Sequence, residues 1–201
     1  MGNAQLITRV GNNSAGLSRD AIDDLNREYR ALDFEARIRR VYQDFAPDKI
    51  MVTSSFAATS AYFLHIISSI RPEQKIHFID TGYHFPETLE TVEEVRRRYG
   101  LNLRMMTVAR QEEELWAADP ENCCSAVKVG QLDRALAGKW AWMSGMRRDE
   151  AETRATAPIV SRDLRGLIKI NPLATWTSDD VDDYIDRHDL VVNPLTKQGY
   201  P

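Results

Sequence analysis

The chain has 201 residues, 43% hydrophobic and 28% charged, a composition typical of a globular protein of one domain. Its formal net charge of -4 at pH 7 argues against non-specific nucleic-acid binding. No window reaches the roughly 18 uncharged apolar residues of a membrane span, and the amino terminus lacks a basic-then-apolar signal segment. These features exclude an integral membrane protein and predict a cytoplasmic one.

Helix and strand patterns alternate along most of the chain. Residues 1–17 are polar and weakly patterned, which predicts a mobile tail, and residues 18–201 are expected to form a single domain. The expected elements are a helix starting at Ser18, a helix at 33–45, a strand at 50–55, a helix at 59–70, a strand at 75–80, a helix at 86–100, a strand at 101–108, a helix at 125–138, a strand at 140–145, a charged loop at 147–156, a strand from Leu167 ended by Pro172, and a helix at 177–188. This order predicts an α/β fold with a mostly parallel sheet and helices on both faces, whose ligands bind at the carboxyl ends of the strands.

Two of the loops at those strand ends have features of nucleotide contacts. In "TSSFAATS", Ser54, Ser55 and Phe56 follow a strand and lead into a helix, where free backbone N–H groups suit an anion. In "DTGYHFPET", Asp80 can accept hydrogen bonds from a ribose or order the turn. Gly82 permits close approach of the backbone to a ligand. The alternative for the first loop is an ordinary strand-to-helix turn with serine caps. His84, also in the second loop, is expected to be a solvated loop histidine.

A third loop is rich in arginine. "GMRRDEAETRAT" contains Arg147, Arg148 and Arg154, and guanidinium groups bind phosphate and sulfate oxygens in bidentate fashion. A polyanionic small molecule would suit this loop. A solvated loop balanced by its own acidic residues is the alternative.

The only two cysteines, Cys123 and Cys124, are adjacent, with Lys128 four residues further on. A disulfide between neighbours forces unusual backbone geometry, so the pair is poorly placed to bridge itself. Two thiolates can bind an iron–sulfur cluster, which is usually held by four such ligands. An inert buried pair is the alternative.

Taken in order, these motifs resemble the assimilatory adenylyl-sulfate (APS) and phosphoadenylyl-sulfate (PAPS) reductases. The resemblance covers about Ile50 to Pro201 and includes "TSSF", "IDTGYHFPET", "CCSAVK", "GMRRDEAETRA", "KINPLATWTSDDVDDYI" and "NPLTKQGYP". It implies an adenine-nucleotide alpha-hydrolase-like (PP-loop-type) fold. It also implies reduction of the sulfonucleotide to sulfite and AMP, with electrons from thioredoxin, in a protein that forms homo-oligomers.

The resemblance also implies roles for individual residues. Ser54, Ser55 and Phe56 match the modified phosphate loop, and Asp80, Thr81 and Gly82 match the second nucleotide-contacting turn. Lys128 and Arg154 match catalytic basic residues that face the phosphosulfate. Arg147 and Arg148 help to shape the loop that contains Arg154. Cys123 and Cys124 match half of the 4Fe-4S site of the APS-using branch.

The chain departs from the family pattern at two places. Ala57 replaces the glycine of the family's "SSFG" loop. After "GYP" the family continues with a C-x-x-C pair and a tail carrying the nucleophilic cysteine, so we expect the sequence to be a truncated chain that is inactive alone.

Other functions compatible with the sequence are a PAPS or dual APS/PAPS reductase and a non-catalytic AMP- or sulfonucleotide-binding module. An ATP pyrophosphatase of the related loop superfamily is less favoured. Its usual serine-glycine-glycine-x-aspartate-serine loop is absent, and "TSSFAATS" lacks the acidic residue expected there.

Overall fold

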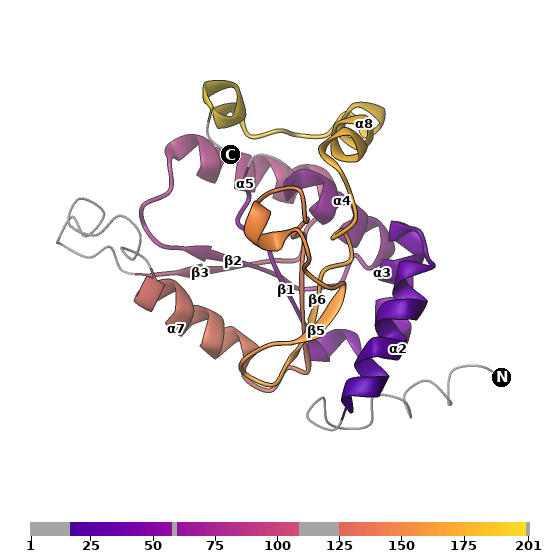
Figure 1. Ribbon diagram of the computed structural model, residues 1–201. Coiled ribbons are helices and arrows are strands. Elements are labelled where there is room, and N and C mark those ends of the chain that lie inside the picture. Colours follow the sequence, from indigo (N-terminus) through magenta and orange to yellow (C-terminus); the bar gives the residue numbers. More distant parts are fainter. Residues whose placement is uncertain (1–16, 58–59, 109–124, 200–201) are drawn as a thin grey trace.

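The computed structural model describes residues 17–57, 60–108 and 125–199 (Figure 1). Within them a six-stranded sheet has the order β3-β2-β1-β4-β6-β5. The strands are β1 (Ile50–Thr53), β2 (Ile76–Asp80), β3 (Leu103–Thr107), β4 (Ala141–Ser144), β5 (Val160–Arg162) and β6 (Ile168–Ile170). The α-helices are α2 (Arg19–Arg30), α3 (Phe34–Asp44), α4 (Ser60–Ile70), α5 (Pro86–Tyr99), α7 (Ser125–Leu136) and α8 (Ser178–His188). Single-turn helices are η2 (Pro47–Lys49), η3 (Glu152–Arg154) and η4 (Pro194–Gln198).

The sheet is parallel except at one edge. β1 pairs in parallel with both β2 and β4, β2 with β3, and β4 with β6, whereas β5 runs antiparallel to β6. The predicted α/β fold with a mostly parallel sheet is therefore confirmed. None of the helices in the described ranges is both long and apolar enough to cross a membrane.

Alternation along β1 divides the interior between the two faces of the sheet. Ile50 and Val52 join the large core, which also takes buried residues from α2, α3, α4, α5 and α8. Met51 points to the other face and packs with Leu136 of α7. Figure 1 shows α7 on the side of the sheet opposite α4 and α5. Because both faces are covered at the centre of the sheet, β1 is apolar on both of its sides up to Thr53.

Three helices begin or end at the capping residues that the sequence predicts. Ser18 accepts a hydrogen bond from the Ala21 N–H, and Thr177 forms a reciprocal capping box with Asp180. Gly100 ends α5 in the left-handed conformation, with φ of 62°. The predicted starts at Ser18 and Thr177 and the predicted stop at Gly100 are confirmed.

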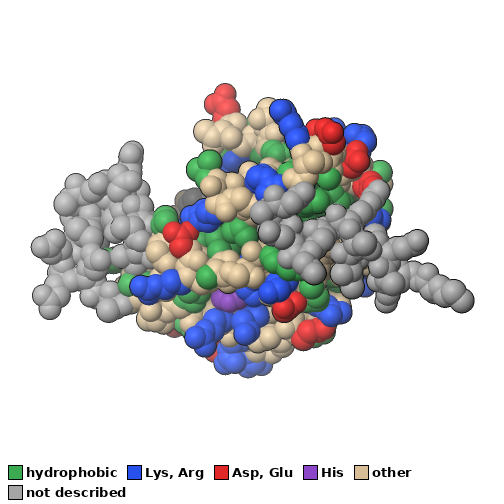
Figure 2. Space-filling model, turned by 90° about the horizontal axis from the view of Figure 1, so that it is seen from below, with side chains coloured by type: hydrophobic (Ala, Val, Ile, Leu, Met, Phe, Trp, Pro, Cys, Tyr) green, Lys and Arg blue, Asp and Glu red, His purple; other side chains and the backbone are tan. Residues whose placement is uncertain are grey.

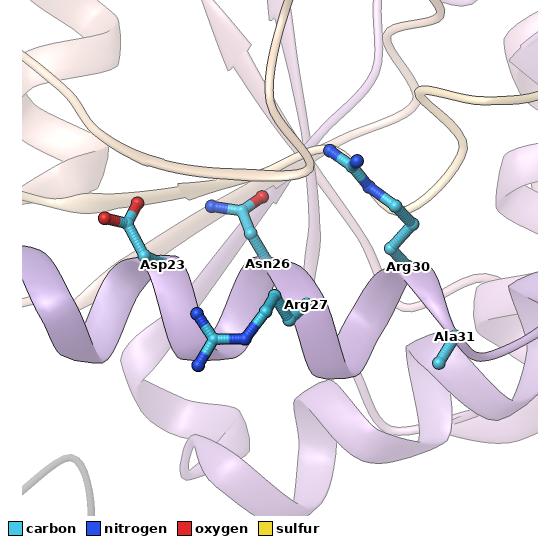
Figure 3. Close-up of a pocket in the computed structure, with 5 residues that line it drawn as sticks. All are labelled: Asp23, Asn26, Arg27, Arg30 and Ala31. Atoms are coloured by element: carbon cyan, nitrogen blue, oxygen red, sulfur yellow. The ribbon is translucent and has the colours of Figure 1, made fainter.

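The antiparallel edge strand β5 was not expected from the sequence. It spans only Val160–Arg162 and carries polar residues on its outer side, so no apolar pattern marks it. The Asn26 carboxamide donates to the Val160 carbonyl at 2.7 Å and accepts from its N–H at 2.9 Å. Asn26 thus supplies the edge of β5 with the two hydrogen bonds that another strand would provide. Figure 3 shows Asn26 in a pocket along α2, beside Asp23, Arg27 and Arg30.

Arg37 is buried although it lies in the arginine-rich stretch Arg37-Ile38-Arg39-Arg40. Its side chain is 4% exposed. Its guanidinium donates to the carbonyls of Tyr29, Leu32 and Pro172, and so ties α3 to the end of α2 and to the loop after β6. Arg37 is a structural residue because carbonyl oxygens, not solvent, satisfy its donors.

Candidate functional site

The candidate site lies at the carboxyl edge of the sheet, where β1 and β4 end side by side. Thr53 of β1 is opposite Ser144 of β4 in the parallel register. After β1 the chain adds β2 and β3 on one side of that strand. It then returns to β4 on the other side of β1, and β6 and β5 lie beyond β4. This is the point at which strand order reverses, and open α/β sheets bind ligands at such points. The loops after β1, β2 and β4 therefore converge here.

The hydroxyl groups of the first loop are engaged locally. Ser54 Oγ accepts from the Phe56 N–H at 3.1 Å, and Ser55 Oγ accepts from the Ala57 N–H at 3.4 Å. Such side-chain turns hold the backbone in a tight bend. The Ser54 N–H donates to the His77 carbonyl at 3.2 Å, which fixes the loop to β2. The bend lies directly before α4, as the anion-binding interpretation requires.

Phe56 occupies an uncommon backbone conformation for a bulky residue, with φ of 52°. Its ring is 2% exposed and meets Phe78 edge to face at a centroid distance of 5.2 Å. Asn193 donates to its carbonyl at 3.4 Å. The Phe56 side chain is thus buried in the core, so a ligand of the first loop would meet the backbone of this residue. Backbone strain of this kind concentrates at functional sites.

The second loop is a tight turn closed by Asp80. Its Oδ1 accepts from the Gly82 N–H at 2.9 Å, and Gly82 has φ of 78°. Thr81 between them is 8% exposed. The carboxylate therefore orders the turn, and Gly82 supplies the positive φ that the turn needs. His84 lies below it, with Nε2 hydrogen-bonded to the Ile79 carbonyl at 3.2 Å and its ring against Phe78, which is a structural role.

Arg147 in the third loop is committed to carboxylates of its own chain. Its side chain is 6% exposed and pairs with Asp149 at 2.9 Å and with Glu150 at 3.6 Å. Asp149 also accepts from the Ser178 hydroxyl at 3.0 Å, at the start of α8. Arg147 therefore holds the loop after β4 together through Asp149 and Glu150, and its charge is already balanced.

Arg148 and Arg154 are more available to a ligand. The Arg148 Nε donates to the Ala157 carbonyl at 2.8 Å, and no carboxylate in the described parts of the chain lies within ion-pair distance of this residue. Arg154 pairs with Glu150 at 2.6 Å while its side chain remains 49% exposed. The three arginines thus divide into a buried support, Arg147, and two cations that a dianion can reach.

Close backbone packing below the third loop was not visible in the sequence. A Cβ added to Gly145 would lie 3.0 Å from the Phe63 ring, so a side chain there would displace a core residue. The Tyr62 hydroxyl donates to the Gly145 carbonyl at 3.2 Å. These two contacts join the start of the loop to α4, the helix that follows the first loop. A side chain is excluded at Gly145 because α4 and β4 are close in space, which the sequence around Gly145 does not indicate.

Lys128 is exposed on α7, in the turn that begins the described part of this helix. α7 packs against β2 and leads into β4, so it runs opposite to the strands and its first turn lies toward their carboxyl ends. Cys123 and Cys124 are outside the described residues. Within those that are described, no group of three or more His, Cys, Asp or Glu side chains could hold a metal.

A second basic surface is separate from these loops. Lys75, Lys139 and Arg104 each lower the pKa of His77, after the larger effect of its burial. Lys139 is itself tied to the Asp48 carbonyl at 2.6 Å. Lys75 and Lys139 precede β2 and β4, which places them at the amino ends of the strands. Figure 2 shows the Lys and Arg side chains that gather on the underside of the molecule.

The fold and this carboxyl-edge arrangement define the class: an adenine-nucleotide alpha-hydrolase-like, PP-loop-type α/β protein. Structures of this class match the chain at low identity. Yeast FAD synthetase has 15% identity and a TM-score of 0.59 over 98% of this chain and 71% of the synthetase chain. The family follows from a closer match: residues 49–201 fit the phosphoadenosine phosphosulfate reductase domain, and the chain belongs to that family.

Relatives within the family carry two names. A protein of Rhodococcus opacus named adenosine 5'-phosphosulfate reductase is 44% identical over 69% of this chain and 60% of its own length. One of Gloeobacter violaceus named phosphoadenosine 5'-phosphosulfate reductase is 37% identical over 92% of this chain and 81% of its own length. The chain thus spans about 60% of the length of the Rhodococcus relative. A crystal structure of PAPS reductase from Candida auris, in complex with phosphate, has 29% identity and a TM-score of 0.81, over 92% of this chain and 94% of the fungal one.

Proposed function

We propose that the chain is the nucleotide-binding core of a reductase that converts APS to sulfite and AMP in sulfate assimilation. The observation that carries this proposal is that the Ser54 bend, the Asp80 turn and the arginine-rich loop follow β1, β2 and β4, which are neighbours at the carboxyl edge of the sheet. This arrangement suits a nucleoside with an anionic tail. The adenine nucleoside would lie over the first two loops, and the phosphosulfate would face the third.

Basic side chains would provide the chemistry at the phosphosulfate. Arg154 and Lys128 would stabilise the charge that develops on the phosphate of AMP as it leaves. Arg147, paired with two carboxylates, would hold the loop in place. The phosphate complex of the fungal relative supports an oxyanion site in proteins of this fold.

Cys123 and Cys124 would supply two of the four thiolates of a 4Fe-4S cluster. They are the only cysteines in the sequence, so the other two ligands would come from residues outside these 201. When bound, the cluster would supply a charged centre, and Lys128 follows Cys124 by four residues in the sequence. The higher identity to relatives named for APS than to the relative named for PAPS supports the APS assignment.

The covalent step would also need a cysteine outside these residues. Its thiolate would attack the sulfur of the nucleotide, so that an S–S bond forms, the S–O bond to the phosphate breaks, and AMP leaves with that oxygen and the bonding electron pair. A dithiol such as thioredoxin would then release sulfite and become oxidised to a disulfide. That step supplies the two electrons of the reduction.

The first test is an intact-mass determination on natively expressed protein, with its iron content and its activity toward APS and PAPS. We expect a mass above 23.0 kDa, about four irons per chain and a preference for APS. A marked preference for PAPS would contradict the substrate assignment. Binding of AMP without iron or reduction would instead favour the non-catalytic module.

Replacing Arg154 with alanine is expected to weaken APS and AMP binding by about 1.5 to 3 kcal/mol, because a charge-assisted contact is lost. Arg39 provides a matched control. It is also about half exposed, at 56%, and pairs with a glutamate four residues earlier, at 3.6 Å, but it lies on α3. Calorimetric titration should show wild-type affinity for Arg39→Ala. Equal losses in both variants would remove Arg154 from the site.

A further inference from the structure

A lysine that the family resemblance did not single out lies next to the candidate site. Lys169 is the middle residue of β6, opposite Trp142 of β4 in the parallel register. Its ammonium nitrogen lies 4.2 Å from the centroid of the Trp142 ring, within the range of a cation–π contact. The Lys169 side chain is half-buried on the face of the sheet that α7 covers.

Trp142 directs this lysine toward the carboxyl edge. The register places Trp142 opposite Met51, yet its indole Nε1–H donates to the Thr53 hydroxyl at 2.8 Å. Thr53 is two residues, or about 6 to 7 Å, further along β1 and is its last residue. The indole therefore leans along the strands toward the first loop, and the ammonium lies over the leaning ring.

The charge of Lys169 has no balancing carboxylate among the described residues. In the parts of the chain that the structure covers, no carboxylate lies within ion-pair distance of it. Asp163, whose negative charge acts to raise the pKa of Lys169, already accepts the Leu167 and Arg165 N–H groups and pairs with the Arg165 guanidinium at 3.4 Å. Burial, followed by the nearby positive charge of Arg154, lowers the pKa of Lys169. A half-buried ammonium that no described carboxylate pairs with, held over an indole that leans toward the carboxyl edge, can bind an anion there.

We propose that Lys169, held over Trp142, is a further binding residue for the phosphate or phosphosulfate group of the nucleotide, acting together with Arg154. The inference rests on the proposed function, because it assigns a contact within the same site. The two possible roles of Lys169, anion binding and packing on Trp142, differ in whether the positive charge is needed. An anion contact needs the charge, whereas packing over the indole needs only the aliphatic stem.

The test compares Lys169→Gln and Lys169→Met with the wild-type protein, by calorimetric titration with AMP, APS and adenosine. Methionine keeps the apolar stem over Trp142, so Lys169→Met remains informative where Lys169→Gln fails to fold. We expect each variant to bind AMP and APS about tenfold or more weakly, with adenosine affinity changed by less than about twofold. Unchanged AMP affinity, or an equal loss for AMP and adenosine, would overturn the proposal.

Lys49 provides the matched control. It is also half-buried and its ammonium lies 5.5 Å from the centroid of Trp140, but both residues precede their strands, at the opposite edge of the sheet. Lys49→Gln should bind AMP as the wild type does, and an equal loss in this variant would contradict a local role for Lys169. Wild-type protein that binds neither AMP nor APS would refute the proposed function itself. Normal binding by both the wild type and the Lys169 variants would refute only this inference.

Discussion

Replacing Lys128 with alanine is expected to lower kcat for APS reduction by about 100- to 1,000-fold. That is the range for removing one preorganised donor from a developing charge. In the proposed function, the exposed ammonium near the start of α7 meets the leaving phosphate, and no described carboxylate pairs with it. The change would affect the transition state more than the bound nucleotide, so kcat should fall more than AMP affinity. Steady-state kinetics on natively expressed protein, with thioredoxin as the reductant, gives both quantities.

Arg134→Ala is the matched control for this prediction. Arg134 is an exposed cation on the same helix, in its last turn, and so lies toward the amino edge of the sheet. It should leave kcat within about twofold of wild type, as surface changes away from a site usually do. Iron content is measured for both variants, since Lys128 follows the cysteine pair closely. A Lys128 variant that retains full kcat with its iron intact would rule out the catalytic role.

The fold was readable from the sequence because most of its elements carry local signals. β1 and β2 are short apolar runs, α2 and α8 begin at capping residues, and α5 ends at Gly100. β5 lacks such a signal: it is held by Asn26 from a helix more than one hundred residues away in sequence, at 2.7 and 2.9 Å. An edge strand fixed by a long-range side-chain contact leaves no local pattern.

The site was only partly predictable, for a related reason. Residue type indicates what a side chain can bind, but not whether the protein itself has already used it. Arg147, Arg148 and Arg154 look alike in the sequence, yet the structure buries the first between two carboxylates and leaves the last half exposed. The sequence around Lys169 indicates only a strand, because the contact of this lysine with Trp142 depends on the register of β4 and β6.

Phe56→Ala is expected to destabilise the folded protein by about 3 to 5 kcal/mol, the usual range for removing a fully buried phenylalanine. The ring is 2% exposed and packs edge to face on Phe78, so the variant loses transfer energy and leaves a cavity below the first loop. Urea unfolding followed by tryptophan fluorescence and by circular dichroism gives the free energy of unfolding. Coincident transitions would support the two-state analysis.

Phe56→Gly separates packing from backbone strain at this position. At an ordinary position in a helix or strand, a glycine variant is less stable than an alanine variant, because glycine gains more conformational entropy when the protein unfolds. At φ of 52° the order should reverse by about 1 kcal/mol, since a Cβ is disfavoured in the left-handed region and glycine is not. A glycine variant less stable than the alanine variant would show that the bend imposes no strain on Phe56. The predicted order would mean that core packing of the ring holds the backbone of the first loop in a conformation it would not otherwise adopt.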